Sequence, residues 1–211
     1  DKTLFLEQLD FLINKGENNA VIGSYVSRSN IKYGLSKSNP FCNEPLKYVF
    51  KNDLIPESDF KNIFIKGAND ILNDERVKEK DQSLITNGIQ TAGNIFTHLG
   101  EVTNEIKDVI HKEIEKYKLH FKGSEEGIIK SWPEQYELYG WLVSMKNGGE
   151  LAPHMHEQGW LSGSIYINVP PRVNKDSGNL VLCLDKNNDV KVSSNQSKSI
   201  KVVTGSICLF P

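Results

Sequence analysis

Two of the five histidines in this 211-residue chain, His154 and His156, stand two positions apart. Neutral imidazole is a good ligand for Fe, Zn, Cu or Ni. The segment 151–156 and its neighbours 139–145 and 161–169 have the residue pattern of β-strands. Because residues i and i+2 of a strand point to the same face, the two imidazoles would be directed at one point. The spacing therefore indicates a metal site.

Two histidines do not make a strong metal site, so a third ligand is needed. The candidate carboxylates in the chain are Glu157, Asp176, Asp185 and Asp189. A regular strand would turn Glu157 to the face opposite His156, although a bulge could bring it back. The alternative interpretation of the pair is an exposed turn, or two hydrogen-bonded core histidines that bind no metal.

The composition is that of a globular protein, with 38% hydrophobic residues, 25% charged residues and a net charge of −2. This balance gives no electrostatic argument for nucleic acid or an anionic membrane. No run approaches the roughly 18 apolar residues of a membrane span, and the N-terminus has no signal-peptide pattern. The cysteines, Cys42, Cys183 and Cys208, are odd in number and far apart, which indicates reduced thiols. We therefore expect a cytoplasmic protein.

The elements that must position the histidines are helical in the first half of the chain and β in the second. Apolar residues at helical spacing predict helices over about 4–13, 21–34, 58–72 and 102–117. From Glu137 onward the period changes to two. Strands are expected over 139–145, 151–156, 161–169, 179–184, 190–193, 199–203 and 206–210. Helices first and short strands later predict an α+β fold in which the strands form a sandwich or barrel.

Several segments around the histidines resemble a bacterial family of 2-oxoglutarate- and Fe(II)-dependent oxygenases. In that family a Trp-rich strand leads to His-x-His and then to a Ser-Gly-x-x-Tyr strand that ends in Pro. The matching segments here are 141–149, 153–156 and 160–170, followed by Gly178-Asn179-Leu180 and by Gly205 to Pro211. The resemblance covers roughly residues 50 to 211, and the block from His-x-His to Ser-Gly-x-x-Tyr is its most specific part.

The resemblance implies a double-stranded β-helix, or jelly roll, whose mouth holds the iron. His154 would be the first metal ligand. His156 falls where relatives outside this family place a carboxylate, so the site would have three imidazoles in place of two histidines and one carboxylate. Ser144, Ser162 and Tyr166 are polar groups on neighbouring strands that could hydrogen-bond bound 2-oxoglutarate. The alternative role of Tyr166 is that of a core residue with a satisfied hydroxyl group.

The resemblance also implies residues that this chain does not include. In the family, a distal histidine and a basic residue that binds 2-oxoglutarate follow the Leu-Phe-Pro strand, which here ends at Pro211. We therefore expect the jelly roll to be truncated at its C-terminal strands and the chain as given to lack full activity. An uncovered sheet edge favours association, so a homodimer that covers it is one expected partner arrangement.

The sequence thus predicts a helical segment at 1–45, similar to the flank of tetratricopeptide-repeat proteins, and an oxygenase-like domain with its flanking helices at 46–211. The expected function is an Fe(II)- and 2-oxoglutarate-dependent dioxygenase, an oxidoreductase that hydroxylates a small molecule or a peptide. No nucleic-acid or membrane partner is expected. Two alternatives stay open: a non-catalytic jelly-roll module for binding or assembly, and a cupin-type metalloenzyme that does not use 2-oxoglutarate.

Overall fold

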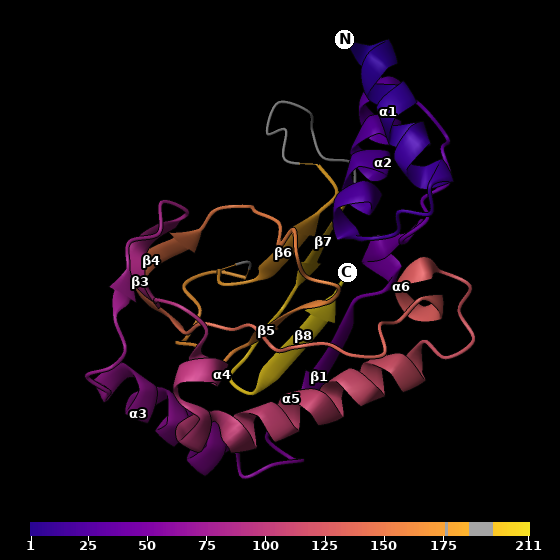
Figure 1. Cartoon of the computed structure of the whole chain (residues 1–211). Coiled ribbons are helices and arrows are strands. Elements are labelled where there is room, and N and C mark those ends of the chain that lie inside the picture. The colour runs from indigo at the N-terminus through magenta and orange to yellow at the C-terminus, as the bar shows by residue number, and fades with distance from the viewer. Residues whose placement is uncertain (176, 186–195) are drawn as a thin grey trace.

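A computed structural model of the chain describes residues 1–175, 177–185 and 196–211, and its elements are arranged as in Figure 1. The helices are α1 (Lys2–Asn14), α2 (Ala20–Tyr33), α3 (Gly67–Asn73), α4 (Ile95–His98), α5 (Gly100–His120) and α6 (Gly127–Lys130), with a 3-10 turn at Pro45–Lys47 and a π-helical turn at Lys61–Lys66. The strands are β1 (Phe50–Asp53), β2 (Glu79–Lys80), β3 (Ile85–Thr91), β4 (Val143–Leu151), β5 (Ser162–Ile165), β6 (Leu180–Cys183), β7 (Ser197–Ile200) and β8 (Ser206–Phe210).

The central sheet has the antiparallel order β1-β8-β5, so the last strand of the chain lies between two others. Strand β8 is buried on both faces because its side chains alternate between two clusters. Ile207 and Leu209 belong to the main core, whereas Cys208 packs with Ile200 and Val202 on the other face. The sheet therefore lies between α5 and the β6–β7 pair (Figure 1).

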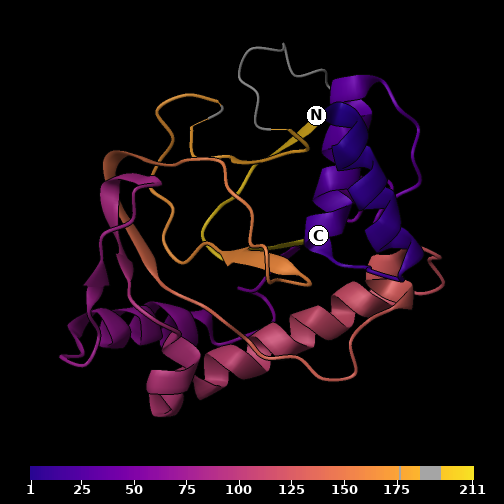
Figure 2. The same ribbon diagram turned by 45° about the horizontal axis from the view of Figure 1, so that its top comes forward.

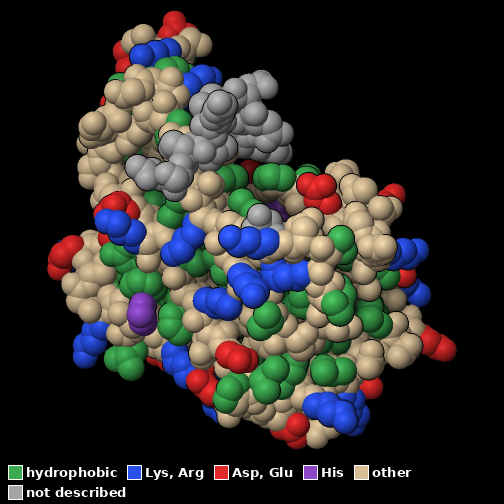
Figure 3. All heavy atoms as spheres, turned by 180° about the vertical axis from the view of Figure 1, so that it is seen from behind, with side chains coloured by type: hydrophobic (Ala, Val, Ile, Leu, Met, Phe, Trp, Pro, Cys, Tyr) green, Lys and Arg blue, Asp and Glu red, His purple; other side chains and the backbone are tan. Residues whose placement is uncertain are grey.

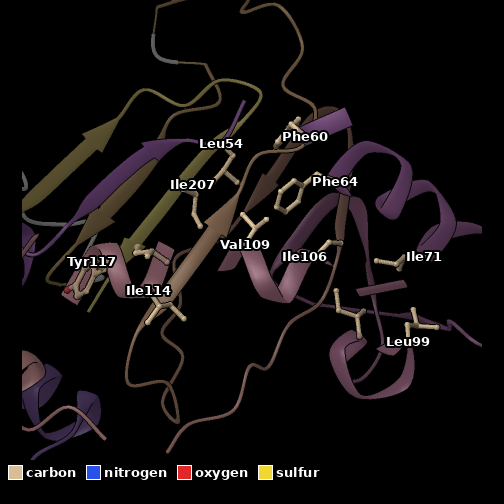
Figure 4. Close-up of a cluster of buried hydrophobic side chains, with 12 residues drawn as sticks. Leu54, Phe60, Phe64, Ile71, Leu99, Ile106, Val109, Ile114, Tyr117 and Ile207 are labelled. Atoms are coloured by element: carbon tan, nitrogen blue, oxygen red, sulfur yellow. The ribbon is translucent and has the colours of Figure 1, made fainter. Parts of the chain in front are cut away.

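The main core forms where the apolar stripe of α5 meets the central sheet and the segment around α3 (Figure 4). Tyr117 is fully buried, and its hydroxyl group donates a hydrogen bond to the carbonyl oxygen of Tyr48 at 3.0 Å. Full burial of an aliphatic side chain such as Ile106, Val109 or Ile114 of α5 stabilises a fold by about 1.5–3 kcal/mol. The expected helix at 102–117 is thus confirmed as an amphipathic helix that supports the sheet.

Strands β5 to β8 form two nested antiparallel pairs. The inner pair, β6 with β7, lies in the chain between the partners of the outer pair, β5 with β8. A second three-stranded sheet has the order β2-β3-β4, and a register shift between Thr86 and Gly88 interrupts the pairing of β3 with β4. Figures 1 and 2 place this sheet on the opposite side of the molecule from α1 and α2.

Helices α1 and α2 form an antiparallel pair with a small core of their own around Leu9, Ile22 and Val26. Both ends of α2 lie at residues whose types favour helix ends. The Asn19 side chain accepts a hydrogen bond from the Ile22 amide at 3.0 Å, and Gly34 ends α2 in the left-handed conformation with φ of 63°. The two helices expected at 4–13 and 21–34 are therefore confirmed.

Positive charge is locally concentrated although the whole chain carries a net charge of only −2. Lys and Arg side chains gather over the middle of the face shown in Figure 3. A hollow of about 520 Å³ has Arg172, Lys175 and Lys201 in its lining, and the Lys51 ammonium group donates to the Lys201 carbonyl oxygen at 2.8 Å.

Among the described residues, no helix combines the length and the apolar character needed to cross a bilayer.

The α+β class is confirmed, but several expected boundaries are wrong. The expected strand 151–156 does not form, because β4 ends at Leu151 and residues 152–156 have no regular structure. Strand β5 stops at Ile165, and the expected helix 58–72 divides into the π-helical turn and α3. The expected strand 190–193 lies outside the described residues. The jelly roll, expected to be truncated at its C-terminal strands, stays a prediction.

Candidate metal site

The two histidines lie in the loop 152–161, between β4 and β5. Backbone hydrogen bonds fix both ends of this loop. The Ala152 amide donates to the Leu84 carbonyl oxygen at 2.8 Å, and Ser162 pairs with Phe210 in the central sheet. Within the loop, the Gly159 amide donates to the His156 carbonyl oxygen at 3.0 Å. The histidines are therefore presented by a loop held between two sheets, and not by a strand as expected.

The imidazoles nevertheless converge as the spacing predicted. The Nε2 atoms of His154 and His156 lie 3.1 Å apart, and the ring centroids are separated by 5.0 Å. Two imidazole ligands with metal–nitrogen bonds of about 2.1 Å, bound at adjacent positions, have their nitrogens about 3 Å apart. The observed separation therefore fits two neighbouring positions on one metal ion.

The ring of His154 is fixed in the form that leaves Nε2 free to bind. Its Nδ1 atom lies 2.9 Å from the Ala152 carbonyl oxygen. A carbonyl oxygen only accepts hydrogen bonds, so Nδ1 must carry the proton. In a neutral imidazole, the Nε2 atom then keeps its lone pair. A backbone carbonyl bonded to the other ring nitrogen is a common support for a metal-binding histidine.

The ring of His156 is supported by Ser162, whose Oγ atom lies 3.2 Å from Nδ1. A serine hydroxyl group can donate or accept, so it suits either tautomer of the ring. When His156 donates from Nε2 to His154, the hydroxyl group donates to Nδ1. When a metal takes Nε2, Nδ1 carries the proton and donates to the hydroxyl group. Ser162 thus allows the change of tautomer without loss of its hydrogen bond.

Burial, followed by the nearby His154, lowers the pKa of His156 below its usual value. The edge of its ring also meets Trp141, with ring centroids 5.2 Å apart at 85°. The lowered pKa favours the neutral imidazole at pH 7, which is the form that binds metals. His154 is more exposed than His156, so the pair is open to solvent on the His154 side.

The structure does not supply a third ligand from the residues it describes, which contain no group of three or more His, Cys, Asp or Glu side chains placed to hold a metal ion. Glu157 is exposed beside His156 but does not join the pair. The Asp185 carboxylate lies 3.8 Å from the guanidinium group of Arg28. Asp176 and Asp189, the other two candidates, lie outside the described residues.

The three predicted 2-oxoglutarate-binding residues are not brought together. Ser162 contacts His156, whereas Tyr166 packs between the central sheet and the β6–β7 pair, with its hydroxyl group 3.4 Å from the Ser164 Oγ atom. Burial raises the pKa of Tyr166. Ser144 is exposed on β4, where its backbone pairs with Ile89. Within the described residues, neither Tyr166 nor Ser144 contacts the histidines.

Trp160 contributes to the loop in a way that the sequence did not reveal. Its indole Nε1 atom donates to the Ile128 carbonyl oxygen at 3.0 Å, and its ring meets the edge of Phe41 with centroids 5.1 Å apart. No local pattern could identify partners that lie so far away along the chain.

Comparison with known proteins finds a family match in the part of the chain that contains both histidines. Residues 139–211 match the model of a family described as "Putative 2OG-Fe(II) oxygenase". The match includes both histidines and the strands β4 to β8, and residues 1–138 lie outside it. No curated protein and no solved structure matches the chain.

Proposed function

We propose that this chain belongs to an Fe(II)- and 2-oxoglutarate-dependent oxygenase, with His154 and His156 as two of its iron ligands. The convergence of the two Nε2 atoms to 3.1 Å, within the stretch that matches the oxygenase family, is the observation that carries the proposal. The substrate would be a small molecule or a peptide. The third ligand would come from outside the described residues.

The chain's own part in the chemistry is to hold the two rings. The Ala152 carbonyl oxygen and the Ser162 hydroxyl group fix the orientation of the imidazoles, and the lowered pKa of His156 keeps its ring neutral. Loss of such a supporting hydrogen bond typically lowers metal affinity or activity by about 10–100-fold. Iron, when bound together with 2-oxoglutarate, would supply hydroxylation of a C–H bond by dioxygen, coupled to decarboxylation of the 2-oxoglutarate.

The strand pairing supports the proposed jelly roll. A long antiparallel hairpin that folds over itself gives nested pairs, with the ends of the segment in one sheet and its middle in another. Strands β5 and β8 belong to the central sheet, while β6 and β7 pair separately on its far face. Jelly rolls are built from two such sheets facing each other.

An anaerobic titration with Fe(II), followed by 2-oxoglutarate, tests the proposed function. We expect a visible charge-transfer band of the iron–keto-acid complex, which His154→Ala abolishes. His111→Ala is the matched control, because His111 lies on α5 and its Nδ1 contacts the Tyr136 hydroxyl group instead. That variant should keep the band.

The other outcomes select between the rival functions. Fe(II) binding without any response to 2-oxoglutarate would support a metalloenzyme of the cupin type. No Fe(II) binding by the wild-type chain would support a non-catalytic module, a role consistent with two histidines that hydrogen-bond each other. Either result would contradict the proposed oxygenase.

A further inference from the structure

The loop 152–161 is held mainly by contacts close in sequence. His154 bonds to Ala152, His156 to Ser162, and the Gly159 amide to the His156 carbonyl oxygen. The two ends of the loop are fixed as well, since the Ala152 amide donates to the Leu84 carbonyl oxygen and Ser162 belongs to β5. Between these ends, Trp160 adds a long-range side-chain hydrogen bond, to a carbonyl oxygen 32 positions earlier in the chain.

The partners of Trp160 form a rigid support. Phe41 and Ile128 are 3% and 0% exposed, and the Ile128 amide donates to the Phe41 carbonyl oxygen at 2.8 Å. At the start of α6, a Cβ atom added to Gly127 would lie 2.0 Å from the Pro40 carbonyl oxygen. A side chain therefore does not fit at position 127, and the backbones of α6 and the segment 39–43 pack directly against each other.

The support continues into the N-terminal helices through Asn39, which is 6% exposed. Its Oδ1 atom accepts hydrogen bonds from the amides of Phe41 and Cys42 at 3.0 and 3.1 Å. Its Nδ2 atom donates to the carbonyl oxygen of Gly23 in α2 at 2.9 Å. Each hydrogen-bonding side of this amide is therefore used, and α2 is joined to the support of the histidine loop.

We propose that the segment 39–43 and α6 position the histidine loop through Trp160. Trp160 is a positioning residue: it contacts neither imidazole in the structure and acts on them through the loop. The consequence for metal binding rests on the proposed function. The placement of the loop itself does not. By this proposal, the helices before residue 45 influence a metal site that lies over a hundred residues further along the chain.

The proposal predicts how the metal affinity changes when the support is weakened. When the hydrogen bond of Trp160 to Ile128 is lost, the loop spends less time in the conformation in which the two Nε2 atoms converge. The apparent affinity falls in proportion to that lost population. A neutral hydrogen bond of ordinary strength corresponds to about a fivefold change in such an equilibrium. Because the structure has the loop in this conformation, removal of the indole N–H should raise the small open population about fivefold and weaken Co(II) binding by less than about twofold.

Three variants test this with two readouts. Trp160→Phe removes the hydrogen bond to Ile128, and Phe41→Leu removes the aromatic contact with Trp160. Trp132→Phe is the matched control, because the buried Nε1 atom of Trp132 has no hydrogen-bond partner and its ring packs in the main core. The readouts are the Co(II) dissociation constant and, without metal, cleavage of the native protein after the exposed Glu157 by a glutamyl endopeptidase.

We expect Trp160→Phe and Phe41→Leu each to accelerate cleavage after Glu157 by about fivefold, and to weaken Co(II) binding by less than about twofold. Trp132→Phe should leave both within twofold of wild type, whatever its effect on the melting temperature. Wild-type cleavage in Trp160→Phe, or equal acceleration in Trp132→Phe, would overturn the proposal. If wild type binds no Co(II) but Trp160→Phe accelerates cleavage, the positioning role stands and the proposed oxygenase does not.

Discussion

The Oγ atom of Ser162 lies 3.2 Å from Nδ1 of His156, which joins the first residue of β5 to the second predicted ligand. The bond spans only six positions, yet it connects the loop to the central sheet. Strand β5 pairs with β8, and β8 is buried on both faces. The orientation of the His156 ring is thus set by the most buried strand of the molecule.

This relationship predicts the effect of Ser162→Ala. Loss of the hydroxyl group leaves Nδ1 of His156 without its partner, so we expect metal affinity to fall by about tenfold, within the usual range for such supporting bonds. Isothermal titration with Co(II) measures the change. Ser162→Thr keeps a hydroxyl group and should restore most of the affinity. Ser164→Ala, two residues along the same strand, is the control and should bind as wild type does.

The two histidines should contribute comparably to metal binding. We expect His154→Ala and His156→Ala each to weaken Ni(II) binding at least tenfold, because one imidazole remains in either variant. The double variant His154→Ala/His156→Ala should bind Ni(II) as weakly as the triple variant that also carries His111→Ala. Affinities that are unchanged in one single variant would show that the corresponding imidazole is not a ligand. Ni(II) binding followed by competition with a chromophoric chelator provides the measurement.

The sequence was most informative where the relevant contacts are local. The stripe of α5 and the capping residues of α2 depend on neighbours three or four positions away, and both helices form where expected. The pairing of β1 with β8 joins Phe50 to Leu209. That contact depends on the whole fold, and β1 was not among the expected strands.

In the candidate site, too, local contacts could be predicted from the sequence and long-range contacts could not. Convergence of His154 and His156 was predictable from their spacing, although a loop and not a strand produces it. Ser162 was selected as a polar group for 2-oxoglutarate, but the structure gives it a different contact, to His156. The support through Trp160 and Phe41 was not predictable, since tertiary packing alone brings them together.

The three cysteines should differ sharply in reactivity. Burial raises the pKa of Cys42 to about 12 and that of Cys208 to about 11, whereas Cys183 is exposed on β6. The thiolate is the reactive form, so at pH 8 a raised pKa leaves Cys42 and Cys208 almost wholly protonated. We expect one rapidly alkylated thiol in the native protein, identified by peptide mapping as Cys183.

Two measurements control this prediction. Cys183→Ser should show no rapid alkylation in the native state, and denaturant should make the two remaining thiols react. The slow thiols should gain reactivity only as the pH approaches their raised pKa values, because the thiolate fraction increases with pH. Rapid labelling of Cys208 at pH 8 would contradict the burial of β8 between the two clusters.

The packing of β8 against α5 should account for a large part of the stability. Ile207 is 1% exposed in the main core, beside Leu54 and Val109 in Figure 4. Ile207→Ala removes buried methyl groups and leaves a cavity, which typically lowers the free energy of unfolding by about 2–5 kcal/mol. Urea denaturation measures this change.

Val181→Ala is the control for this experiment, because Val181 is 59% exposed on β6. A surface substitution of this kind changes the free energy of unfolding by about 0.5 kcal/mol or less. The slope of the transition should be the same in both variants if only the folded state is affected. An Ile207→Ala midpoint equal to that of Val181→Ala would mean that β8 does not pack against α5, and the central layer of the fold would be wrong.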